Sequence, residues 1–440
     1  MHILFLTDNF PPEVNAPASR TFEHCREWVK AGHRVTVITC APNFPKGRVF
    51  GGYKNRLWQR ETMDGVEVVR VWSYITANEG FVRRTLDYVS FMVSAVPASL
   101  RVPRPDIVVS TSPQFFTACA GYAVSRLRRA PFIFELRDLW PESIRAVGAM
   151  KQSVALDWLE KLELFLYRKA AAIVSVTHAF KRNLIARGID PSKIHVVTNG
   201  ADLSLFRPRE KDAELVQALG LAGKFVAGYI GTHGMAHALE TLLEGARLLQ
   251  EEGRDDIRLL FLGNGASKAS LVARASELKL RNVMFVDTVP KADVVRYWSL
   301  LDVSIIHLRK TELFTTVIPS KLFECMAMGI PILHGVEGES ADIVTKENVG
   351  LPFEPENVTE LNANLLRLVR EPELLAGFRR SGPIGATHYD RQTLAAGMLE
   401  HLERAAARAK REGRQTDAAR IPAPAATAQI TDPTESDRTL

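Results

Sequence analysis

The sequence predicts an α/β protein with two doubly wound domains, each a parallel sheet wound with helices, that face each other across a cleft. Three observations support this fold class. The chain has 440 residues, too many for one ordinary core. Short β-branched runs alternate with helical patterns along most of it. These runs form two sets, which meet at a polar, turn-rich stretch over residues 193–212. We therefore expect domains at 1–200 and 201–385.

Continuous apolar runs indicate strands that are buried on both faces. In the first domain such runs lie at 2–8, 34–40, 66–71, 106–111, 132–138 and 172–176, with helical patterns at 16–31 and 153–170. In the second domain they lie at 225–231, 257–263, 283–287, 303–308 and 331–336, with helical patterns at 236–252 and 266–280. Helical periodicity returns at 391–412, so we expect a C-terminal helix over 386–412. The stretch 413–440 is poor in large apolar groups and should be disordered.

Composition limits the protein class only partly. The formal net charge of +6 is compatible with anionic ligands, nucleic acid or an anionic membrane. No basic stripe with interleaved aromatic residues is present, so we expect no nucleic-acid partner. The four cysteines lie far apart with no CxxC pair, which suits reduced thiols in the cytoplasm. The N-terminus has the pattern of a strand rather than of a signal peptide, and no apolar stretch is long enough to span a membrane.

Two glycine-rich turns follow the first two strands of the second domain. Gly231 and Gly234 bracket the first turn, and Gly263 and Gly265 form the second. Glycines let backbone amides approach an anion at a helix start, so a phosphate could bind here. Packing glycines and ordinary turn chemistry are equally good explanations. His233 and His237 could hold a metal, but no third ligand is evident, and a histidine that donates to phosphate is the better interpretation.

The stretch "IPSKLFECMAMGIPIL" (318–333) contains a charged pair, Lys321 and Glu324, at a helix start. A carboxylate in the first turn is favoured by the helix dipole alone, and a ribose hydroxyl pair is the functional alternative. Lys321 could meet a phosphate, and Arg309 and Lys310 add two positive charges after the preceding strand.

The first domain would supply the opposite wall of the cleft. Arg20 is a candidate contact for an acceptor or a phosphate, and Asp138 follows a strand where a charged group could face a sugar. Trp140 lies in the same loop, and a salt bridge of Arg137 is the structural alternative. Residues 78–106 place Arg83 and Arg84 before a broken apolar run, which could lie on a bilayer surface, hold an acceptor lipid or form an interior helix.

Several motifs together resemble the retaining glycosyltransferases of family 4, which have the GT-B fold. The second half carries "VVTNGADLSLF", "FLGNGASKASL", "VPKADVVRYWSLLDVSIIHL" and "PSKLFECMAMGIPIL". The first half carries "ILFLTDNFPPEVNAPASR", "GHRVTVITCAPNFPKG", "PDIVVSTSPQF" and "FELRDLWPESI", which with "PSKLFE" resemble an L-fucosamine transferase-like subgroup of surface-polysaccharide biosynthesis. The resemblance covers roughly residues 1 to 400.

The resemblance implies two Rossmann-like domains and a C-terminal helix that crosses back to the first domain. It implies a nucleotide-sugar substrate, UDP-linked and an N-acetylated amino sugar, with no cofactor and no metal. Transfer would proceed with retention to a glycan or polyprenyl-linked glycan. The protein would be cytoplasmic and peripheral on the inner face of the plasma membrane.

The sequence departs from the family pattern in two places. The family has two glutamates with seven residues between them, and Glu324 matches the one that binds the ribose. Thr316 stands at the position of the other glutamate, so Glu312 becomes the substitute candidate for it. Glu312 and Asp138 are therefore the candidate catalytic residues. The family's phosphate-binding Arg and Lys are replaced by Thr232 and His237, which moves the expected charge to Lys321, Arg309 and Lys310. A sugar-nucleotide epimerase of the same fold is the alternative function.

Overall fold

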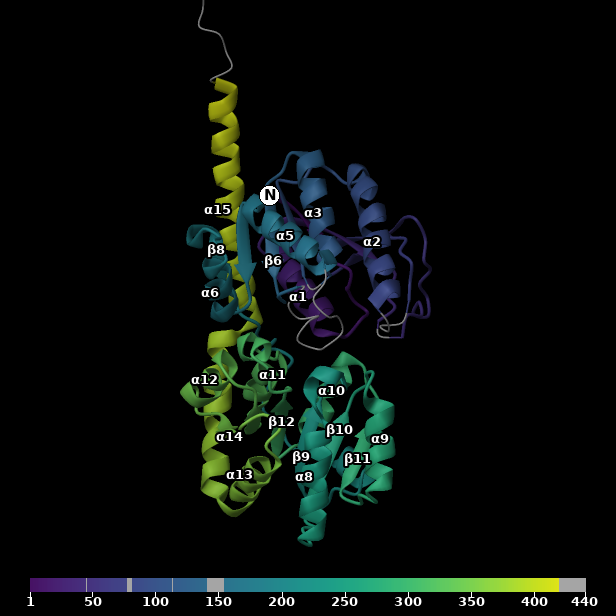
Figure 1. The fold of residues 1–440 in the computed structure, drawn as a ribbon, viewed down its shortest axis with the longest axis vertical. Coiled ribbons are helices and arrows are strands. Elements are labelled where there is room, and N and C mark those ends of the chain that lie inside the picture. The colour runs from purple at the N-terminus through teal and green to yellow at the C-terminus, as the bar shows by residue number, and fades with distance from the viewer. Residues whose placement is uncertain (45, 77–80, 113, 141–153, 419–440) are drawn as a thin grey trace, which may run out of the picture.

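The protein is seen in a computed structural model that describes residues 1–44, 46–76, 81–112, 114–140 and 154–418. Two α/β domains stack end to end, and a long C-terminal helix runs beside the first of them (Figure 1). The predicted fold class is therefore confirmed.

The first domain is built on an eight-stranded sheet in the order β3-β4-β2-β1-β5-β6-β7-β8. Its strands are β1 (His2–Leu6), β2 (Arg34–Cys40), β3 (Gln59–Met63), β4 (Val66–Val71), β5 (Ile107–Thr111), β6 (Phe132–Leu136), β7 (Ala172–Ser175) and β8 (Ile194–Val196). All neighbouring pairs are parallel except β3 with β4. The main helices are α1 (Ala16–Lys30), α2 (Phe81–Ala98), α3 (Phe115–Arg128), α5 (Val154–Lys169) and α6 (His178–Ala186).

The second domain has a six-stranded parallel sheet in the order β11-β10-β9-β12-β13-β14. Its strands are β9 (Phe225–Ile230), β10 (Ile257–Leu262), β11 (Val283–Val286), β12 (Val303–His307), β13 (Ile332–Gly335) and β14 (Gly350–Pro352). Its helices are α7 (Ala213–Ala218), α8 (Glu240–Glu251), α9 (Lys268–Glu277), α10 (Lys291–Trp298), α11 (Lys321–Met328), α12 (Glu339–Lys346), α13 (Val358–Arg370) and α14 (Pro372–Ala386). The buried faces of the central strands β9, β10 and β12 explain their continuous apolar sequences.

The sequence interpretation missed three short strands, β3, β8 and β14. A local signal for β3 was present, because Asp64 and Gly65 form a two-residue turn with positive φ at both positions. Asp-Gly between two alternating runs is a strong hairpin signal. β8 and β14 each have three residues, too few to show a period.

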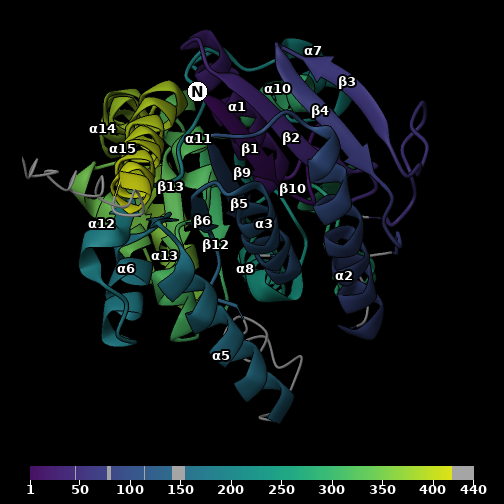
Figure 2. The ribbon, with the colours of Figure 1, turned by 90° about the horizontal axis from the view of Figure 1, so that it is seen from above.

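Helix α15 (Arg391–Ala418) crosses back to the first domain, as the resemblance implied (Figure 1), and Figure 2 looks along this helix. The indole Nε1 of Trp28 in α1 donates to the carbonyl of Ala395 over 2.8 Å. Met398, Leu402 and Ala406 are buried in the apolar cluster of the first domain. The helix continues six residues past the predicted end at 412, and residues 419–440 lie outside the described part of the chain.

Two chain crossings join the domains and lie side by side. Ala201 in the first crossing pairs with Asp390 in the second. The amide of Ala201 donates to the carbonyl of Tyr389 over 3.1 Å, and the amide of Arg391 donates to the carbonyl of Ala201 over 2.9 Å. Gly200 is required there, because a Cβ at that position would lie 2.0 Å from the carbonyl oxygen of Tyr389.

The domains also touch on the cleft side. Leu313 of the second domain is buried in the apolar cluster around Phe115 of the first domain. The Glu339 carboxylate at the start of α12 accepts the amides of His178 (3.0 Å) and Ala179 (2.8 Å) at the start of α6. A carboxylate at a helix N-terminus is favoured by the unpaired amides and the helix dipole, so this contact holds the domains together.

All four cysteines are free thiols, and Cys25, Cys40 and Cys325 are buried. Within the described ranges, no helix is long and apolar enough to cross a membrane.

Candidate active site

The strand order of the second domain places a topological switch point between β9 and β12. β10 and β11 lie on one side of β9, while β13 and β14 lie on the far side of β12. In open α/β sheets, ligands bind beyond the carboxyl ends of the strands at such a point. The loop after β9 (231–239) and the start of α11, which follows β12, both lie at this switch point.

The ammonium of Lys321 is the central feature of this site. Its Nζ lies 3.6 Å from the centroid of the Tyr229 ring and 2.7 Å from the position a Cβ on Gly231 would occupy. The side chain is partly exposed, but Nζ itself is buried and has no hydrogen-bond partner among the described residues. Burial lowers the pKa of Lys321 to about 7, because an ammonium loses its hydration there. A buried, unpartnered cation of this kind is suited to an anionic ligand.

The glycine-rich loops after β9 and β10 are locked to each other. The amide of Gly231 donates to the carbonyl of Leu262 and the amide of His233 donates to that of Asn264, both over 2.9 Å. A Cβ on Gly263 would lie 1.9 Å from the carbonyl oxygen of Gly231, and one on Gly265 would lie 2.4 Å from that of His233. Close packing between the loops therefore accounts for both glycines, while Gly231 itself faces Lys321.

Lys268 of α9 also holds this region and was missed by the sequence interpretation. Its Nζ donates to the carbonyls of Gly263 (2.8 Å) and Val286 (3.2 Å) and pairs with Asp287 (2.7 Å). The motif "FLGNGASKASL" contains Lys268, but nothing in the sequence showed that the lysine side chain would turn back onto the loop after β10.

Two histidines flank the lysine and are kept neutral. The rings of His233 and His237 each lie 5.8 Å from that of Tyr229, whose hydroxyl donates to the carbonyl of Thr232 over 2.8 Å. Burial, reinforced by the nearby lysines, lowers the pKa of His233 to about 4, and burial and Lys321 lower that of His237 to about 3. Both nitrogens of the His233 ring are buried without a partner in the described structure. Neutral imidazoles can donate to a ligand oxygen without adding charge.

Tyr229 is a further site residue that the sequence interpretation did not identify. It belongs to a buried strand, so its pattern matched the core, and only the folded arrangement shows its ring beneath the Lys321 ammonium.

Glu324 lies half-buried in the first turn of α11, as predicted. Arg309 follows β12 with an exposed side chain, and its amide donates to the carbonyl of Ala236 over 2.8 Å, which ties the loop after β12 to the loop after β9. Lys321, Arg309 and the Gly231–Gly234 turn are thus brought to the same edge of the sheet. Within the described ranges, no three His, Cys, Asp or Glu side chains are placed to hold a metal ion.

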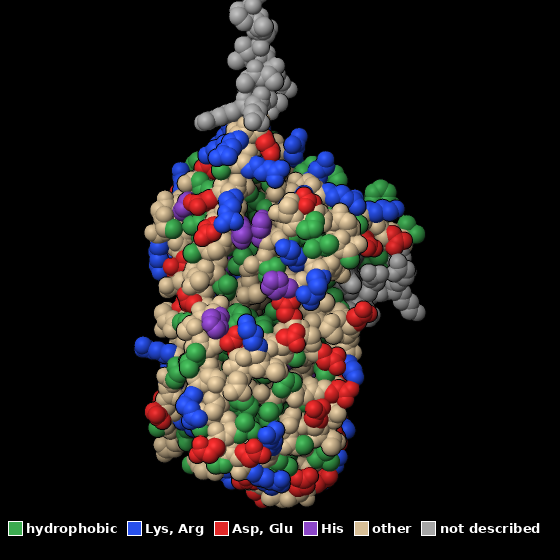
Figure 3. All heavy atoms as spheres, turned by 90° about the vertical axis from the view of Figure 1, so that its left-hand side faces the viewer, with side chains coloured by type: hydrophobic (Ala, Val, Ile, Leu, Met, Phe, Trp, Pro, Cys, Tyr) green, Lys and Arg blue, Asp and Glu red, His purple; other side chains and the backbone are tan. Residues whose placement is uncertain are grey.

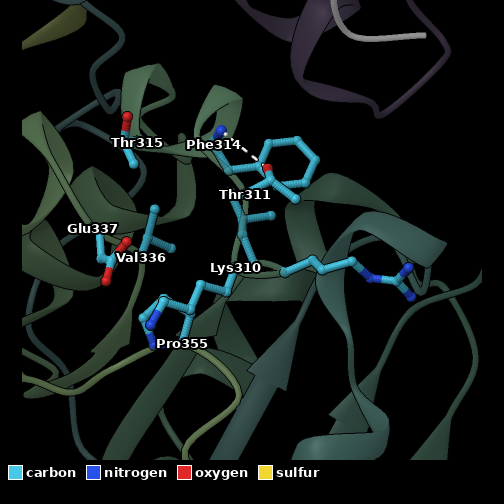
Figure 4. A pocket seen from close by; sticks show the side chains of 9 residues that line it. Lys310, Thr311, Phe314, Thr315, Val336, Glu337 and Pro355 are labelled. Atoms are coloured by element: carbon cyan, nitrogen blue, oxygen red, sulfur yellow. Dashed lines mark hydrogen bonds between the residues drawn. The ribbon is translucent and has the colours of Figure 1, made fainter. Parts of the chain in front are cut away.

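The expectation for Lys310 requires correction. Its Nζ is paired with the carboxylate of Glu354, and its amide donates to Glu356 over 2.7 Å. The charge of Lys310 is therefore directed toward β14 and is not available for a phosphate. Lys310 lines a shallow hollow with Thr311, Thr315 and Glu337 (Figure 4).

The loop between β12 and α11 contains the candidate Glu312. Its side chain is exposed, and its backbone carbonyl accepts the amide of Thr315 over 3.2 Å within a short turn. Thr316 occupies the same turn, where its hydroxyl donates to the carbonyl of Leu313 over 2.6 Å. The next residue, Leu313, packs on the first domain, so Glu312 lies where the two domains meet, and its catalytic role stays a prediction.

The expectation for Arg20 also requires correction. Its side chain is 1% exposed and forms an ion pair with Glu135, with Nε and Oε1 3.0 Å apart. It also donates to the carbonyls of Val197 (3.1 Å) and Thr198 (2.8 Å) in the first interdomain crossing. Arg20 thus anchors α1 to β6 and to the crossing, and it has no surface to offer an acceptor.

The loop after β6 presents the other first-domain candidates. Asp138 is half-buried, and its amide donates to the hydroxyl of Ser112 over 3.2 Å. The Trp140 ring stacks on Phe115 with centroids 4.6 Å apart. Trp140 thus packs on the same apolar cluster that receives Leu313, so part of its predicted acceptor surface is used in packing.

The structure reveals a carboxylate cluster in the first domain that no motif indicated. Asp8 and Glu13 follow β1, and Asp87 projects from α2. Each has one buried oxygen without a hydrogen-bond partner in the described structure. Burial is the main cause that raises their pKa values, to about 6 for Asp8, about 7 for Glu13 and about 8 for Asp87, and mutual repulsion contributes to the last two.

The two domains, each built on a parallel sheet wound with helices, have the GT-B fold. Residues 15–200 match the family model "Glycosyl transferase 4-like domain", and residues 212–383 match "Glycosyl transferases group 1". The chain is thus a glycosyl transferase 4-like domain followed by a glycosyl transferases group 1 domain. Both matches describe transferases, so the epimerase alternative has no support.

Relatives and solved structures agree with this class. The chain is 25% identical over 391 residues to WcaI of Escherichia coli K12, whose name assigns it to colanic acid biosynthesis as a glycosyl transferase; 85% of this chain and 93% of WcaI are covered. It is 23% identical to a GDP-mannose-dependent alpha-mannosyltransferase of Mycolicibacterium smegmatis, covering 80% of this chain and 84% of that protein.

Similar folds occur in a sucrose-phosphate synthase of Thermosynechococcus elongatus and in HepE of Anabaena. The first has a TM-score of 0.71 at 15% identity, covering 95% of this chain and 100% of that chain. HepE in complex with UDP and glucose has a TM-score of 0.69 at 17% identity, covering 92% of this chain and 99% of that chain.

Proposed function

We propose that the protein transfers a sugar, as an N-acetylated amino sugar linked to UDP, to a glycan or polyprenyl-linked glycan in bacterial surface-polysaccharide assembly. The donor site would lie at the switch point of the second domain, and the acceptor would approach from the first. The L-fucosamine transferase-like motifs support the amino sugar, and the name of WcaI supports the polysaccharide. HepE, which has the same fold, was solved with UDP, so UDP is the first nucleotide to test.

The observation that carries this proposal is the buried ammonium of Lys321. A diphosphate placed between the Gly231–Gly234 turn and the start of α11 would supply its missing partner. The amides of Thr232 and Gly234 would meet the remaining charge, since those of Gly231 and His233 are bonded to the loop after β10. Glu324, in the first turn of α11, would accept the ribose hydroxyls. Lys321 thereby takes the place of the family's cations after the first strand, where this chain has Thr232 and His237.

In the reaction, the bond between the anomeric carbon and the diphosphate oxygen breaks, and the acceptor hydroxyl attacks the same face. Attack on the face from which the diphosphate departs gives retention, and the leaving diphosphate accepts the proton of that hydroxyl. Lys321, Arg309 and the loop amides stabilise the negative charge as it grows on the leaving group, so no metal is required for this task. Asp138 from the first domain and Glu312 from the second would face the sugar ring. Closure of the two domains would exclude water, which would otherwise hydrolyse the donor.

Calorimetric titration with UDP, GDP and ADP tests the proposal. We expect UDP to bind selectively, with its affinity reduced at least about 30-fold in Lys321→Ala, because a buried charge pair loses one partner. Glu324→Gln should also weaken UDP and should weaken uracil alone much less. Lys310→Ala is the matched control, since that lysine is paired with Glu354, and it should bind as the wild type does. Equal binding by the wild type and Lys321→Ala would refute the assignment of the donor site.

A further inference from the structure

Arg137 is a cation of the first domain to which the donor site assigns no role. It follows β6, which lies between β5 and β7 in the sheet. Its amide donates to the hydroxyl of Ser112 over 2.8 Å, and the amide of Asp138 donates to the same hydroxyl over 3.2 Å. Ser112 is buried just after β5, so the backbone that carries Arg137 is fixed to the end of the neighbouring strand.

The guanidinium of Arg137 has few partners within the protein. Its Nη1 donates to the carbonyl of Pro17, in the first turn of α1, over a long distance of 3.4 Å. Among the described residues, the other N–H groups of Arg137 have no hydrogen-bond partner, and no carboxylate lies within ion-pair distance. The side chain is partly exposed. The salt bridge that would have explained Arg137 structurally is therefore absent from this part of the chain, and several donors are open to a ligand.

The charge balance around Arg137 explains why it lacks a carboxylate. Two other guanidiniums in this region are already paired, since Arg20 lies 3.0 Å from Glu135 and Arg391 lies 2.8 Å from Glu23. All four of these side chains are buried. Burial is the main cause that lowers the pKa of Arg137 to about 9, and the charges of Arg20 and Arg391 contribute. Three guanidiniums thus share two buried carboxylates, and Arg137 is the one left without a pair.

Arg137 lies where the two domains meet. Leu139 and Trp140, which follow in the same loop, pack in the apolar cluster that also contains Leu313 of the second domain. The segment that carries Leu313 leads from β12 to the start of α11, where Lys321 lies. Arg137 and Lys321 are therefore cations on opposite walls of the same cleft, each with donors that the described residues leave unused.

The first domain also carries an excess of positive charge. Residues 1–200 contain 27 Lys and Arg against 17 Asp and Glu, whereas residues 201–440 contain 29 against 33. On the face in Figure 3, Lys and Arg gather at the upper end, which the first domain and α15 form. A field of this sign favours an anionic group on a substrate that approaches the first domain.

We propose that Arg137 binds a phosphate group of a substrate in the cleft, through charge-assisted hydrogen bonds from its open N–H groups. The proposal rests on the proposed function, since it requires a sugar transfer in which the donor or the acceptor carries phosphate. The phosphate has two possible sources, which are the diphosphate of the donor and a phosphate of a polyprenyl-linked acceptor. In both cases Arg137 holds the substrate next to Asp138, and it takes the phosphate contact that the sequence suggested for Arg20.

Titration of the full chain with UDP and with inorganic pyrophosphate tests this role and separates the two sources. If the phosphate belongs to the donor, Arg137→Gln should weaken UDP at least about 30-fold. If it belongs to the acceptor, UDP affinity should stay unchanged. Pyrophosphate added to protein saturated with UDP should then bind to the wild type and bind at least about 30-fold more weakly to Arg137→Gln. Arg137→Lys should recover part of the lost affinity, because it keeps the charge but not the planar set of donors.

Arg34→Gln is the matched control. Arg34 begins β2, at the opposite edge of the sheet, and its guanidinium pairs with Glu67 over 2.7 Å. This variant should bind both probes as the wild type does. Thermal unfolding of every variant shows whether it is folded, and Arg137→Lys keeps the test decisive if Arg137→Gln does not fold.

Two results would overturn the role of Arg137. One is unchanged UDP affinity in Arg137→Gln together with pyrophosphate binding that is absent from the UDP-saturated wild type or unchanged in the variant. The other is an equal loss of binding and of thermal stability in Arg137→Gln and Arg137→Lys, which would assign the guanidinium to the fold. Failure of the wild type to bind UDP would instead refute the donor site. Pyrophosphate binding that is lost in Arg137→Gln and kept in Lys321→Ala would then leave the role of Arg137 standing.

Discussion

Lys321 and Arg20 show two ways in which a charged side chain can be buried, one without a hydrogen-bond partner among the described residues and one with several. Arg20 is buried with a carboxylate and two backbone carbonyls as partners, so its charge is satisfied within the protein. The Lys321 ammonium is buried on an aromatic ring, which compensates only part of its lost hydration. The lowered pKa of Lys321 results from this incomplete compensation, and a negatively charged ligand would supply the missing interaction.

The lowered pKa of Lys321 predicts a pH dependence of UDP binding. The free protein holds Lys321 with a pKa of about 7, and a bound diphosphate would raise that pKa, so binding takes up a proton above neutral pH. Affinity should therefore be greatest near or below pH 7 and should fall as pH rises, by up to about tenfold per pH unit. His233 and His237 titrate near 4 and 3 and cannot cause this dependence.

Calorimetry at about pH 7 and about pH 8.5, in buffers of different ionisation enthalpy, measures both the affinity and the proton uptake. Lys321→Arg is the companion variant, because a guanidinium stays charged throughout this range. If it binds UDP, its affinity should be independent of pH. A wild-type affinity that does not change with pH would show that Lys321 does not meet the phosphate.

At the scale of elements, the loops after β9 and β10 act as one unit. Their mutual hydrogen bonds and the close approach at Gly263 leave little freedom for either loop alone. The lysine from α11 and the amides of the β9 loop are thereby held in a fixed relation, which is the condition for recognising a ligand without reorganisation.

Gly263→Ala tests this unit. The new Cβ would lie 1.9 Å from the carbonyl oxygen of Gly231, and a φ of 144° adds strain, so the two loops must separate. We expect a loss of about 2 to 4 kcal/mol in the free energy of unfolding of the second domain and a clear loss of UDP affinity.

Gly377→Ala is the matched control, because a Cβ there meets nothing within 4 Å and the residue lies within α14. It should leave UDP affinity unchanged and raise the free energy of unfolding by about 0.5 to 1 kcal/mol. Thermal unfolding measures the stability of both variants, and UDP titration measures their affinity. A fully stable Gly263→Ala protein with normal affinity would contradict the interlocked loops.

At the scale of the whole molecule, two kinds of contact set the relation between the domains. The paired crossings near Ala201 and Asp390 form a narrow connection at one side, and α15 is anchored to the first domain beyond it. On the cleft side, the domains are held in contact by the Leu313 side chain and by the Glu339 carboxylate of α12, which accepts two amides at the start of α6. We predict that opening of the cleft for donor exchange breaks the second set of contacts, with the crossings as the hinge.

Glu339→Ala should therefore shift the protein toward a more open arrangement. It removes two hydrogen bonds to a helix N-terminus, with an expected cost of about 1 to 2 kcal/mol to the closed state. Small-angle scattering should show a larger radius of gyration, and a larger apparent KM for the donor should follow. Asp342→Ala on the same helix is the control, since its exposed side chain makes no contact with α6 that the structure shows. An unchanged scattering curve for Glu339→Ala would count against this contact as a latch.

The sequence by itself determined the two parallel-sheet domains, because strands buried on both faces need continuous apolar runs, and helices between them need their own period. It also determined that Lys321 and Glu324 begin a helix after a strand, since the residues from Lys321 onward are good helix formers. Ser320, which precedes them, makes no capping hydrogen bond with its side chain. Local signals of this kind act over a few residues and are present in the chain before it folds.

Only the tertiary structure decided which charges are satisfied. Arg20 meets Val197 and Thr198, almost 180 positions away, and Lys310 meets Glu354 across the sheet, so neither is available where the sequence suggested. Tyr229 and Lys321 come together from different elements, and the Lys321 ammonium loses its hydration only where the fold buries it against the Tyr229 ring. Burial and pairing depend on residues far apart in the chain, which local patterns do not encode.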